Sequence, residues 1–486
     1  MNSKTPSVKR NFIYNILYQL LTIVTPLLVT PYVSRVLQPE GIGIYAYAYA
    51  TANYFVLVTM MGLNNYGNRM IAKNRENRSN LSQVFWSIYL MQLSISIICI
   101  IGYILMVVIF KDNNIIYWIM ILYVISAGID ITWFFQGLEE FRITIGRNAI
   151  VKIVSTICIF IFVKSKSDVA VYTLIMVGAI FLNQALLWPF VSKFVDHVKI
   201  EPCDIIKHIK PNMILFIPTI AISFYRVMDK IMLGAMSGTV EVGFYDSTDK
   251  LISLPLCIVT AFGTVMLPRM SNLVNKLKID QLSEIVQKSL ALAVLISAPI
   301  MAGMMSIITD FVPFYYGAGY DKCVILFYIL LPSTLFIAMA NVVRTQVLLP
   351  NELDKVFVWS CILGAITNVI INTLLIPKLG SVGAAIGTLV TEIIVFGVQI
   401  VYARKYVDFL EPLKFIAIVL FSSCLMGVIV YNLNITLEST FYKLAIKIVI
   451  GIVIYSLSLL VSAKITKNKL AKEILEVCKV SIKRRK

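Results

Sequence analysis

The chain is a succession of long apolar runs separated by short polar segments, and this pattern restricts the fold more than any other feature. A bilayer core requires roughly 20 mostly apolar residues in each spanning helix. Fourteen segments meet or approach this length: 11–36, 42–63, 82–110, 115–136, 149–163, 169–192, 213–236, 246–268, 284–309, 323–349, 356–376, 382–403, 413–432 and 442–462. The fifth run is short, so we expect its helix to begin before residue 149.

Composition supports the same interpretation. Of the 486 residues, 59% are hydrophobic and only 14% are charged, whereas soluble globular proteins carry about 25% charged residues. The sequence lacks the alternating ten-residue pattern of membrane barrels. The N-terminal segment Met1–Arg10 is followed by about 26 mostly apolar residues with no small-residue cleavage site, so we expect a first membrane helix and not a removed signal peptide. The predicted fold class is an all-α integral membrane protein with about 14 transmembrane helices.

The distribution of Lys and Arg predicts the orientation. If the N-terminus is cytoplasmic, 29 of the 43 basic residues fall on the cytoplasmic side and 7 on the outer side. We therefore predict that both termini are cytoplasmic. The net charge of +17 then reflects topology and anionic lipid, and no aromatic-interleaved basic patch indicates a nucleic-acid partner.

An internal repeat predicts how the helices are grouped. Gly43-Ile44-Tyr45 and Gly243-Phe244-Tyr245 open the second and eighth helices, and Arg69-Met70 and Arg269-Met270 follow the ends of the same helices, all at an offset of 200 residues. Parallel repeats of this kind relate the two halves of many transporters. We predict an N-lobe over 1–192, a C-lobe with its preceding linker over 193–403, two additional helices over 404–462 and a basic cytoplasmic tail over 463–486.

Charged residues inside membrane helices usually face a bundle interior or a wet cavity, because each costs roughly 2.5–3.5 kcal/mol at the bilayer centre. The seventh predicted helix carries Thr219, Ser223, Arg226, Asp229 and Lys230 on one face, and Asp249 and Lys250 open the next helix. Counting Arg226, Lys230 and Lys250 against Asp229 and Asp249 leaves one positive charge. Two interpretations stay open and are compatible: a self-neutralising pair that joins helices, or a cationic wall in an aqueous cavity.

Other polar positions extend this set of candidates. The tenth helix carries Asn341 and Arg344, and Arg344 either faces the cavity or snorkels to the headgroups. The twelfth carries Thr388 and Glu392, and this carboxylate either pairs with a cation such as Arg344 or takes up a proton or sodium ion. The weaker uncharged positions Asn15 and Gln19 lie in the first helix, and Arg35 adds a cation at its outer end.

Catalysis is not indicated. The sequence has no nucleophile elbow, no phosphate-binding glycine loop and no cluster with metal-ligand spacing. The eight cysteines contain no CxxC, and the two histidines, His197 and His208, share one hydrophilic segment. We therefore predict no catalytic residue, no metal site and no bound cofactor, with Na⁺ or H⁺ left open as a coupling ion.

Six segments together resemble the polysaccharide transporter (Wzx-type flippase) family of the MOP exporter superfamily. They lie in order along the first twelve helices: Pro31-Tyr32-Val33-Ser34-Arg35-Val36-Leu37 with Pro39-Glu40-Gly41-Ile42-Gly43-Ile44-Tyr45; Gly62 with Tyr66-Gly67-Asn68-Arg69; Asp229-Lys230-Ile231-Met232-Leu233-Gly234; Val242-Gly243-Phe244-Tyr245; Leu267-Pro268-Arg269-Met270-Ser271; and Gly380-Ser381-Val382-Gly383-Ala384-Ala385. One departure is Gln38, where the family more often has glycine; we expect it to alter the turn and not the function.

The resemblance implies two six-helix lobes around a cavity that opens alternately to each side of the bacterial cytoplasmic membrane. The implied cargo is an undecaprenyl-pyrophosphate-linked oligosaccharide for capsule or O-antigen. A polysaccharide polymerase and a chain-length regulator are the implied protein partners, besides membrane lipid. Arg226, Lys230, Lys250, Arg344 and Arg35 are suitable phosphate-binding cations.

Three alternatives stay open. A MATE-type exporter of drugs coupled to Na⁺ or H⁺ shares the fold, but 14 helices and surplus intramembrane cations argue against it. A lipid II-type flippase for cell-wall precursors is not separated by the sequence. A membrane enzyme such as a polymerase or ligase is disfavoured, because the chain lacks a large outer loop.

Overall fold

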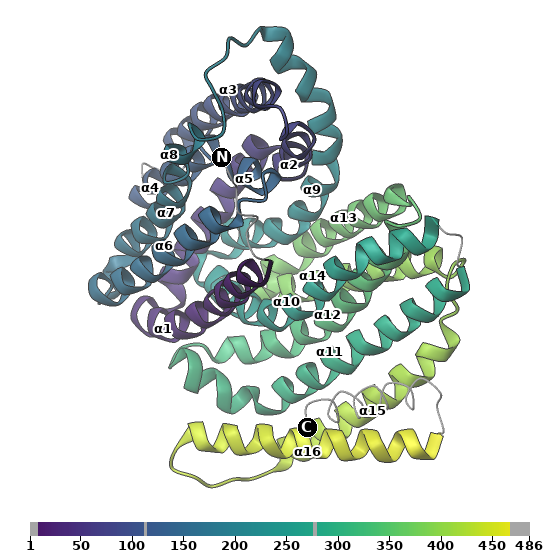
Figure 1. The fold of residues 1–486 in the computed structure, drawn as a ribbon. Helices are drawn as coiled ribbons and strands as arrows, with labels where there is room; N and C mark the ends of the chain where they lie inside the picture. Colours follow the sequence, from purple (N-terminus) through teal and green to yellow (C-terminus); the bar gives the residue numbers. More distant parts are fainter. Residues whose placement is uncertain (1–7, 111–113, 276–278, 467–486) are drawn as a thin grey trace. The chain divides into compact units, whose positions relative to one another are not determined.

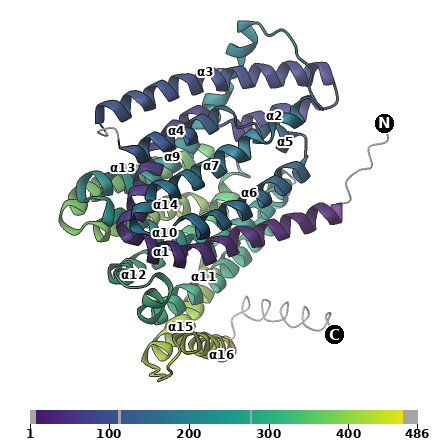
Figure 2. The same ribbon diagram turned by 90° about the vertical axis from the view of Figure 1, so that its left-hand side faces the viewer.

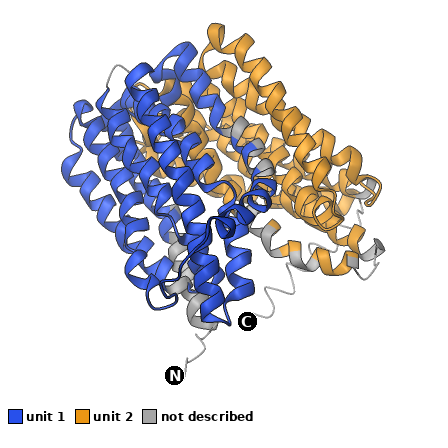
Figure 3. Cartoon of the chain, turned by 90° about the horizontal axis from the view of Figure 1, so that it is seen from above, with its two compact units in different colours: residues 1–243 blue, residues 244–486 orange. Residues whose placement is uncertain are grey.

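The computed structural model describes residues 8–110, 114–275 and 279–466, and within these ranges it is helical with no strand. The chain divides into two compact units, Met1–Gly243 and Phe244–Lys486, drawn in separate colours in Figure 3. Each unit is described by itself. The predicted division at residues 192 and 403 stays a prediction.

The helices of the first unit run in colour from purple through blue to teal in Figure 1. They are α1 (Val8–Met60), α2 (Leu63–Asn74), α3 (Arg78–Phe110), α4 (Ile115–Gly128), α5 (Thr132–Gly137), α6 (Phe141–Phe162), the 3₁₀ turn η1 (Lys166–Asp168), α7 (Val169–Ala185), α8 (Trp188–Val191) and α9 (Pro202–Ser237). The helix α4 packs against α1, α3 and α7, and α9 packs against α1, α2 and α3.

The second unit holds α10 (Thr239–Asn275), whose first turn belongs to the first unit, and the helices that follow it. These are α11 (Ile279–Tyr316), α12 (Asp321–Val343), the π-helical segment η2 (Arg344–Leu348), α13 (Asp354–Leu379), α14 (Ser381–Ala403), α15 (Leu410–Asn432) and α16 (Thr440–Thr466). The last two helices lie against each other and against α11, as Figures 1 and 2 show.

Ten helices of the described residues are long and apolar enough to cross a membrane. They coincide with ten of the fourteen predicted spans, and the fifth begins at Ile143, earlier than 149 as expected. The other four predicted spans fall in α1, α9 and α10. The all-helical membrane fold is confirmed, and the count of fourteen stays a prediction.

The surfaces of these helices are suited to lipid. On α3, for example, Ile98 is 70% exposed and Phe110 is 73% exposed. Large exposed patches of this kind are rare on soluble monomers, and hydrocarbon is the solvent that favours them. Inside the first unit, an aromatic core around Phe85, Trp133 and Phe134 is fully buried.

The helix α1 contains the two first predicted spans, joined across a kink at Gln38. Gln38 has φ 57° and ψ 177°, a region of backbone space that is essentially restricted to glycine and costs other residues about 1–3 kcal/mol. Pro39 follows directly, and it sets the start of the second segment because its ring fixes φ near the helical value. Gln38, which departs from the family pattern of glycine at this position, therefore adopts a backbone conformation that glycine adopts more easily.

Candidate functional site

The helix α9 carries the charged face that the sequence singled out. A reciprocal capping box fixes its start: Glu201 and Asp204 each accept from the other's backbone, with Pro202 at the first helical position. The side chains of Thr219 and Arg226 lie outside the described residues. Asp229 is 2% exposed and Lys230 is half-buried, so this charged face is directed into protein.

The neighbour of this face is the second segment of α1. The Asp229 carboxylate lies within electrostatic range of the Tyr54 hydroxyl. Further along α9, a Cβ on Gly234 would overlap the ring of Tyr47. The absence of a side chain at Gly234 therefore lets the two helices approach closely, and places Asp229 and Lys230 beside α1.

A second close approach joins the two halves of the internal repeat. A Cβ on Gly43 would overlap the Thr239 carbonyl, and a Cβ on Gly243 would overlap the Pro39 carbonyl. Residues 39 and 43 are each 200 positions before 239 and 243, so the contact is reciprocal. Reciprocal contacts of equivalent residues are the signature of a two-fold relation, here between the kink of α1 and the first turn of α10.

Lys250 pairs with a carboxylate that the sequence analysis did not count. Its Nζ lies 2.6 Å from Oδ2 of Asp246, one turn earlier in α10, and the Asp246 side chain is only 4% exposed. Counting Asp246 with Asp229 and Asp249 gives three acidic residues against Arg226, Lys230 and Lys250 along the sequence. The count that left one positive charge omitted Asp246, so charge excess does not identify the cargo.

In the second unit, Thr388 and Glu392 lie on the buried face of α14. The Thr388 Oγ1 lies 2.8 Å from the hydroxyl of Tyr245 on α10, and Glu392 is 5% exposed. Polar contacts continue along the same helix, where Gln399 Nε2 donates to Ser360 Oγ of α13 over 3.0 Å. Glu392 is thus a buried carboxylate in a polar helix interface.

Arg344 begins the π-helical segment η2. Its Nη2 donates to Asn341 Oδ1 over 2.8 Å, and its guanidinium carbon lies 5.4 Å from the centre of the Phe357 ring on α13. Asn341 is 5% exposed. These contacts hold the guanidinium against α13, and π-helical turns frequently occur at functional sites.

Arg35, Asn15 and Gln19 are the remaining predicted residues. Arg35 is exposed and donates to the Pro31 carbonyl over 3.2 Å. The backbone of Asn15 and Gln19 is helical within α1, but their side chains lie outside the described residues.

One polar feature was not predicted, because the apolar run over 115–136 indicates one continuous helix. The helix breaks between α4 and α5, and Asp130 Oδ1 accepts from the Thr132 backbone. Gln92 Nε2 donates to the carbonyls of Ala127 and Asp130, and Trp188 Nε1 donates to that of Ile129. A break at membrane depth is tolerated when side chains satisfy the freed carbonyls. The presence of the charged residue Asp130 inside an apolar run was the sequence feature that could have indicated this break.

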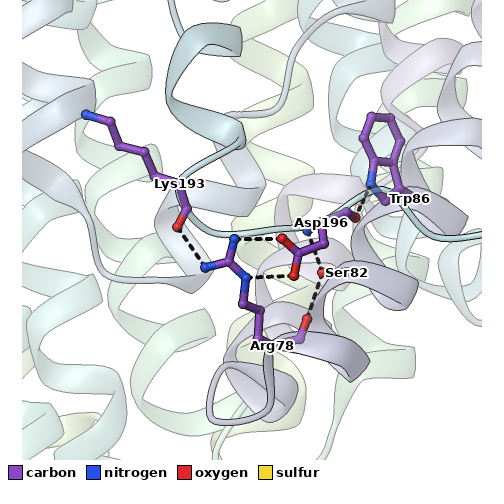
Figure 4. A network of polar contacts seen from close by, with 5 residues as sticks. All are labelled: Arg78, Ser82, Trp86, Lys193 and Asp196. Carbon is purple, nitrogen blue, oxygen red and sulfur yellow. Dashed lines mark hydrogen bonds and ion pairs between the residues drawn. The ribbon is translucent and has the colours of Figure 1, made fainter. Parts of the chain in front are cut away.

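A network on the first unit fastens the segment before α9 to the start of α3 (Figure 4). Arg78 donates from Nε and Nη2 to the two oxygens of Asp196, each over 2.8 Å. Ser82 accepts from the Asp196 backbone, and Trp86 Nε1 donates to its carbonyl over 3.0 Å. The bidentate hydrogen bonds with Arg78 lower the pKa of Asp196.

Both histidines have structural contacts. His208 is 2% exposed, and its Nδ1 shares a hydrogen bond of 2.6 Å with the Tyr66 hydroxyl of α2. Burial, with a smaller effect of Lys207, lowers the pKa of His208 to about 4. The ring of His197 stacks on Trp86.

The described residues contain no group of three His, Cys, Asp or Glu side chains that could hold a metal. The seven cysteines within the described ranges are all free.

Comparison with known proteins identifies the family of this chain. Residues 8–274, more than half of the chain, match the family model described as "Polysaccharide biosynthesis protein". A protein of Escherichia coli (strain K12) named "Putative O-antigen transporter" is 26% identical over 412 residues, covering 83% of this chain and 99% of that protein. The "Probable flippase AglR" of Haloferax volcanii is 25% identical over 247 residues, covering 48% and 51%.

Two solved structures share the fold. The "Lipid II flippase MurJ, inward closed conformation" aligns with a TM-score of 0.71 and 16% identity, over 92% of this chain and 99% of that one. An inward-facing MATE family multidrug resistance transporter of the MOP superfamily aligns with a TM-score of 0.60 and 12% identity, over 80% and 94%. The family model and the residues matched to it establish that the chain belongs to the polysaccharide biosynthesis protein family.

Proposed function

We propose that the protein is a flippase. Its cargo is an undecaprenyl-pyrophosphate-linked oligosaccharide, which it moves from the inner to the outer leaflet of the bacterial cytoplasmic membrane for capsule or O-antigen synthesis. The observation that carries this proposal is the family match over residues 8–274, extended by a relative named for O-antigen transport that aligns over 99% of its own length.

The physical requirement of such a cargo agrees with the residues inside the helices. A diphosphate with attached sugars cannot cross hydrocarbon unaided, because unpaired charge and unsatisfied polar groups are costly there. Lys230 is a half-buried cation on α9, and Arg344 is a cation at η2. Arg226 lies on the same helix as Lys230. Arg and Lys bind phosphate through charge-assisted hydrogen bonds.

Transport against a gradient requires a source of free energy. In this proposal the coupling ion is Na⁺ or H⁺, and the buried carboxylates Asp229 and Glu392 are the groups that would bind it. Both termini are cytoplasmic, as the distribution of basic residues indicates. The protein partners of the pathway are a polysaccharide polymerase and a chain-length regulator.

Deletion of the gene in its host tests the proposal. Undecaprenyl-linked repeat units should accumulate on the cytoplasmic side, and the surface polysaccharide should be lost. Lys230→Ala should reduce export about tenfold, the loss expected for one charge-assisted hydrogen bond, at unchanged protein level. Lys164→Ala is the matched control, since Lys164 is exposed outside the charged face. Normal export in the deletion strain would refute the flippase function.

The same strain separates the alternatives. A lipid II-type flippase would be indicated by accumulation of the cell-wall precursor and by lysis. Loss of drug resistance with normal polysaccharide would indicate a MATE-type exporter.

A further inference from the structure

The second unit contains a charged cluster that the transport site does not use. Asp310 of α11 accepts from two lysines of α16: Lys443 Nζ lies 2.7 Å from Oδ1, and Lys447 Nζ lies 2.9 Å from Oδ2. The side chain of Lys447 is only 6% exposed, and those of Asp310 and Lys443 are 22% and 26% exposed. Two cations share one anion, so the cluster carries a net charge of +1.

This arrangement differs from the usual behaviour of lysine near a helix end. Such lysines extend toward the headgroups and keep the ammonium in water. Lys447 is instead buried. A buried charge is costly unless it is paired, and Asp310 supplies one negative charge for two ammonium groups. The cluster therefore has capacity for one more anion.

An apolar cavity of about 370 Å³ begins at Lys447. It is lined by residues of α11, α15 and α16, among them Ile300, Met304, Met426, Ile448 and Ile452. Tyr455 lines it two turns after Lys447, and its hydroxyl donates to the Leu295 carbonyl over 3.0 Å. At 1.5 Å per residue, the lining segment of α16 is about 12 Å long.

The cavity borders the lipid-facing surface of α16. Ile448 and Ile452 are 49% and 60% exposed, and both line the cavity. A hydrocarbon chain can thus reach the cavity from the bilayer without crossing a polar barrier.

We propose that this cavity and the lysine pair bind an anionic phospholipid, with its phosphate at Lys443 and Lys447 and one acyl chain along α16 toward Tyr455. The net charge selects an anionic headgroup, because a zwitterionic lipid would bring its own cation to the two lysines. The length of about 12 Å set by the α16 segment suits part of one acyl chain better than a long polyprenyl chain. The bound lipid would join α15 and α16 to α11.

Lipid binding to the purified full-length protein tests this proposal, independently of transport. Thermal unfolding is followed in detergent during titration with phosphatidylglycerol, with phosphatidylcholine of the same acyl chains, and with undecaprenyl phosphate. We expect phosphatidylglycerol to raise Tm in a saturable way and phosphatidylcholine to have little effect. Native mass spectrometry should show one phosphatidylglycerol retained per protein.

Variants identify the site. Lys447→Met should weaken phosphatidylglycerol binding about tenfold, as expected for loss of one charge-assisted hydrogen bond. Asp310→Asn should strengthen it, because the net charge of the cluster rises. Gly451→Leu fills the cavity without touching a charge; a Cβ there has its nearest neighbour at 3.5 Å, an ordinary contact. This variant keeps the test usable if Lys447→Met does not fold.

Lys152→Met is the matched control, since Lys152 lies in the membrane helix α6 of the first unit. It should leave phosphatidylglycerol binding unchanged. Equal effects of phosphatidylglycerol and phosphatidylcholine, or unchanged binding in both Lys447→Met and Gly451→Leu, would overturn the proposal. A stronger, Lys447-dependent effect of undecaprenyl phosphate would also overturn it and assign the site to the lipid carrier.

Discussion

Gly43 and Gly243 occupy equivalent places in one reciprocal contact: a Cβ built on Gly43 would lie 2.8 Å from the backbone nitrogen of Gly243. Each glycine faces the backbone of the segment that contains the other. Both positions exclude a side chain for the same geometric reason, and their offset of 200 residues matches the repeat predicted from the sequence. The contact ties the kink of α1 to the first turn of α10.

This equivalence predicts matched effects of substitution. Gly43→Val and Gly243→Val should each lower stability by about 1–3 kcal/mol, because overpacking forces backbone shifts. Flipping should fall in both variants by similar factors. Thermal unfolding of the purified variants checks the first effect, and export in complemented cells checks the second.

Gly178→Ala in α7 is the control for these variants, since a Cβ there meets nothing within 4 Å. It should be neutral or stabilising by up to about 1 kcal/mol, the helix propensity difference between glycine and alanine. A stable and active Gly43→Val variant would show that the close approach is not required.

The kink at Gln38 predicts an unusual stabilisation. Gln38→Gly should raise the free energy of unfolding by about 1 kcal/mol, because glycine adopts φ 57°, ψ 177° without the strain that glutamine carries. Gln38→Ala should give no such gain, since alanine has the same steric restriction. Thermal unfolding of the two variants measures the difference. Equal stability of Gln38→Gly and Gln38→Ala would contradict a strained kink.

The ion pair of Asp246 with Lys250 predicts energetic coupling. A double-mutant cycle of Asp246→Asn and Lys250→Met should give a coupling of about 1 kcal/mol, the upper end for exposed pairs, because half of the Lys250 side chain is exposed. Lys250→Met alone should lower protein level, since it removes the cation beside the buried carboxylate of Asp246. Strict additivity of the two single effects would exclude the pair.

The contact of His208 with Tyr66 predicts a pH dependence of stability. The folded-state pKa of His208 is about 4, below the ordinary value of 6.5, so the unfolded chain takes up the proton first as pH falls. The stability is fully present above pH 6.5 and decreases toward pH 4, by on the order of 3 kcal/mol. His208→Gln should lose this decrease. Unfolding curves at pH 7 and pH 5 measure it, and parallel losses in both proteins would contradict the assignment.

Most of the fold followed from hydrophobic length. Ten predicted spans are found as helices of the described residues, because a bilayer imposes the same run of apolar residues on every spanning helix. The break at Asp130 was missed because the groups that stabilise it are not local: Gln92 and Trp188, which donate to the carbonyls of Ala127, Asp130 and Ile129, lie far from the break in sequence. Long-range hydrogen bonds of this kind leave no local pattern.

The candidate site was only partly predictable. The charged face of α9 was visible as a helical spacing, and the structure buries Asp229 there. The pairing of Lys250 with Asp246 could also have been predicted, because residues four positions apart are neighbours on a helix surface. The ion pair of the buried Lys447 with Asp310 could not be predicted from the sequence, because it depends on the packing of α16 on α11.

Translocation by the purified protein tests the central claim most directly. The protein is reconstituted in liposomes with undecaprenyl-pyrophosphate-linked oligosaccharide in one leaflet, and the glycan that becomes accessible to a glycosidase on the other side is measured over time. We expect protein-dependent translocation that Lys230→Ala slows about tenfold and that a Na⁺ or H⁺ gradient accelerates. Glycan accessibility no faster than in protein-free liposomes, with folded protein present, would contradict it.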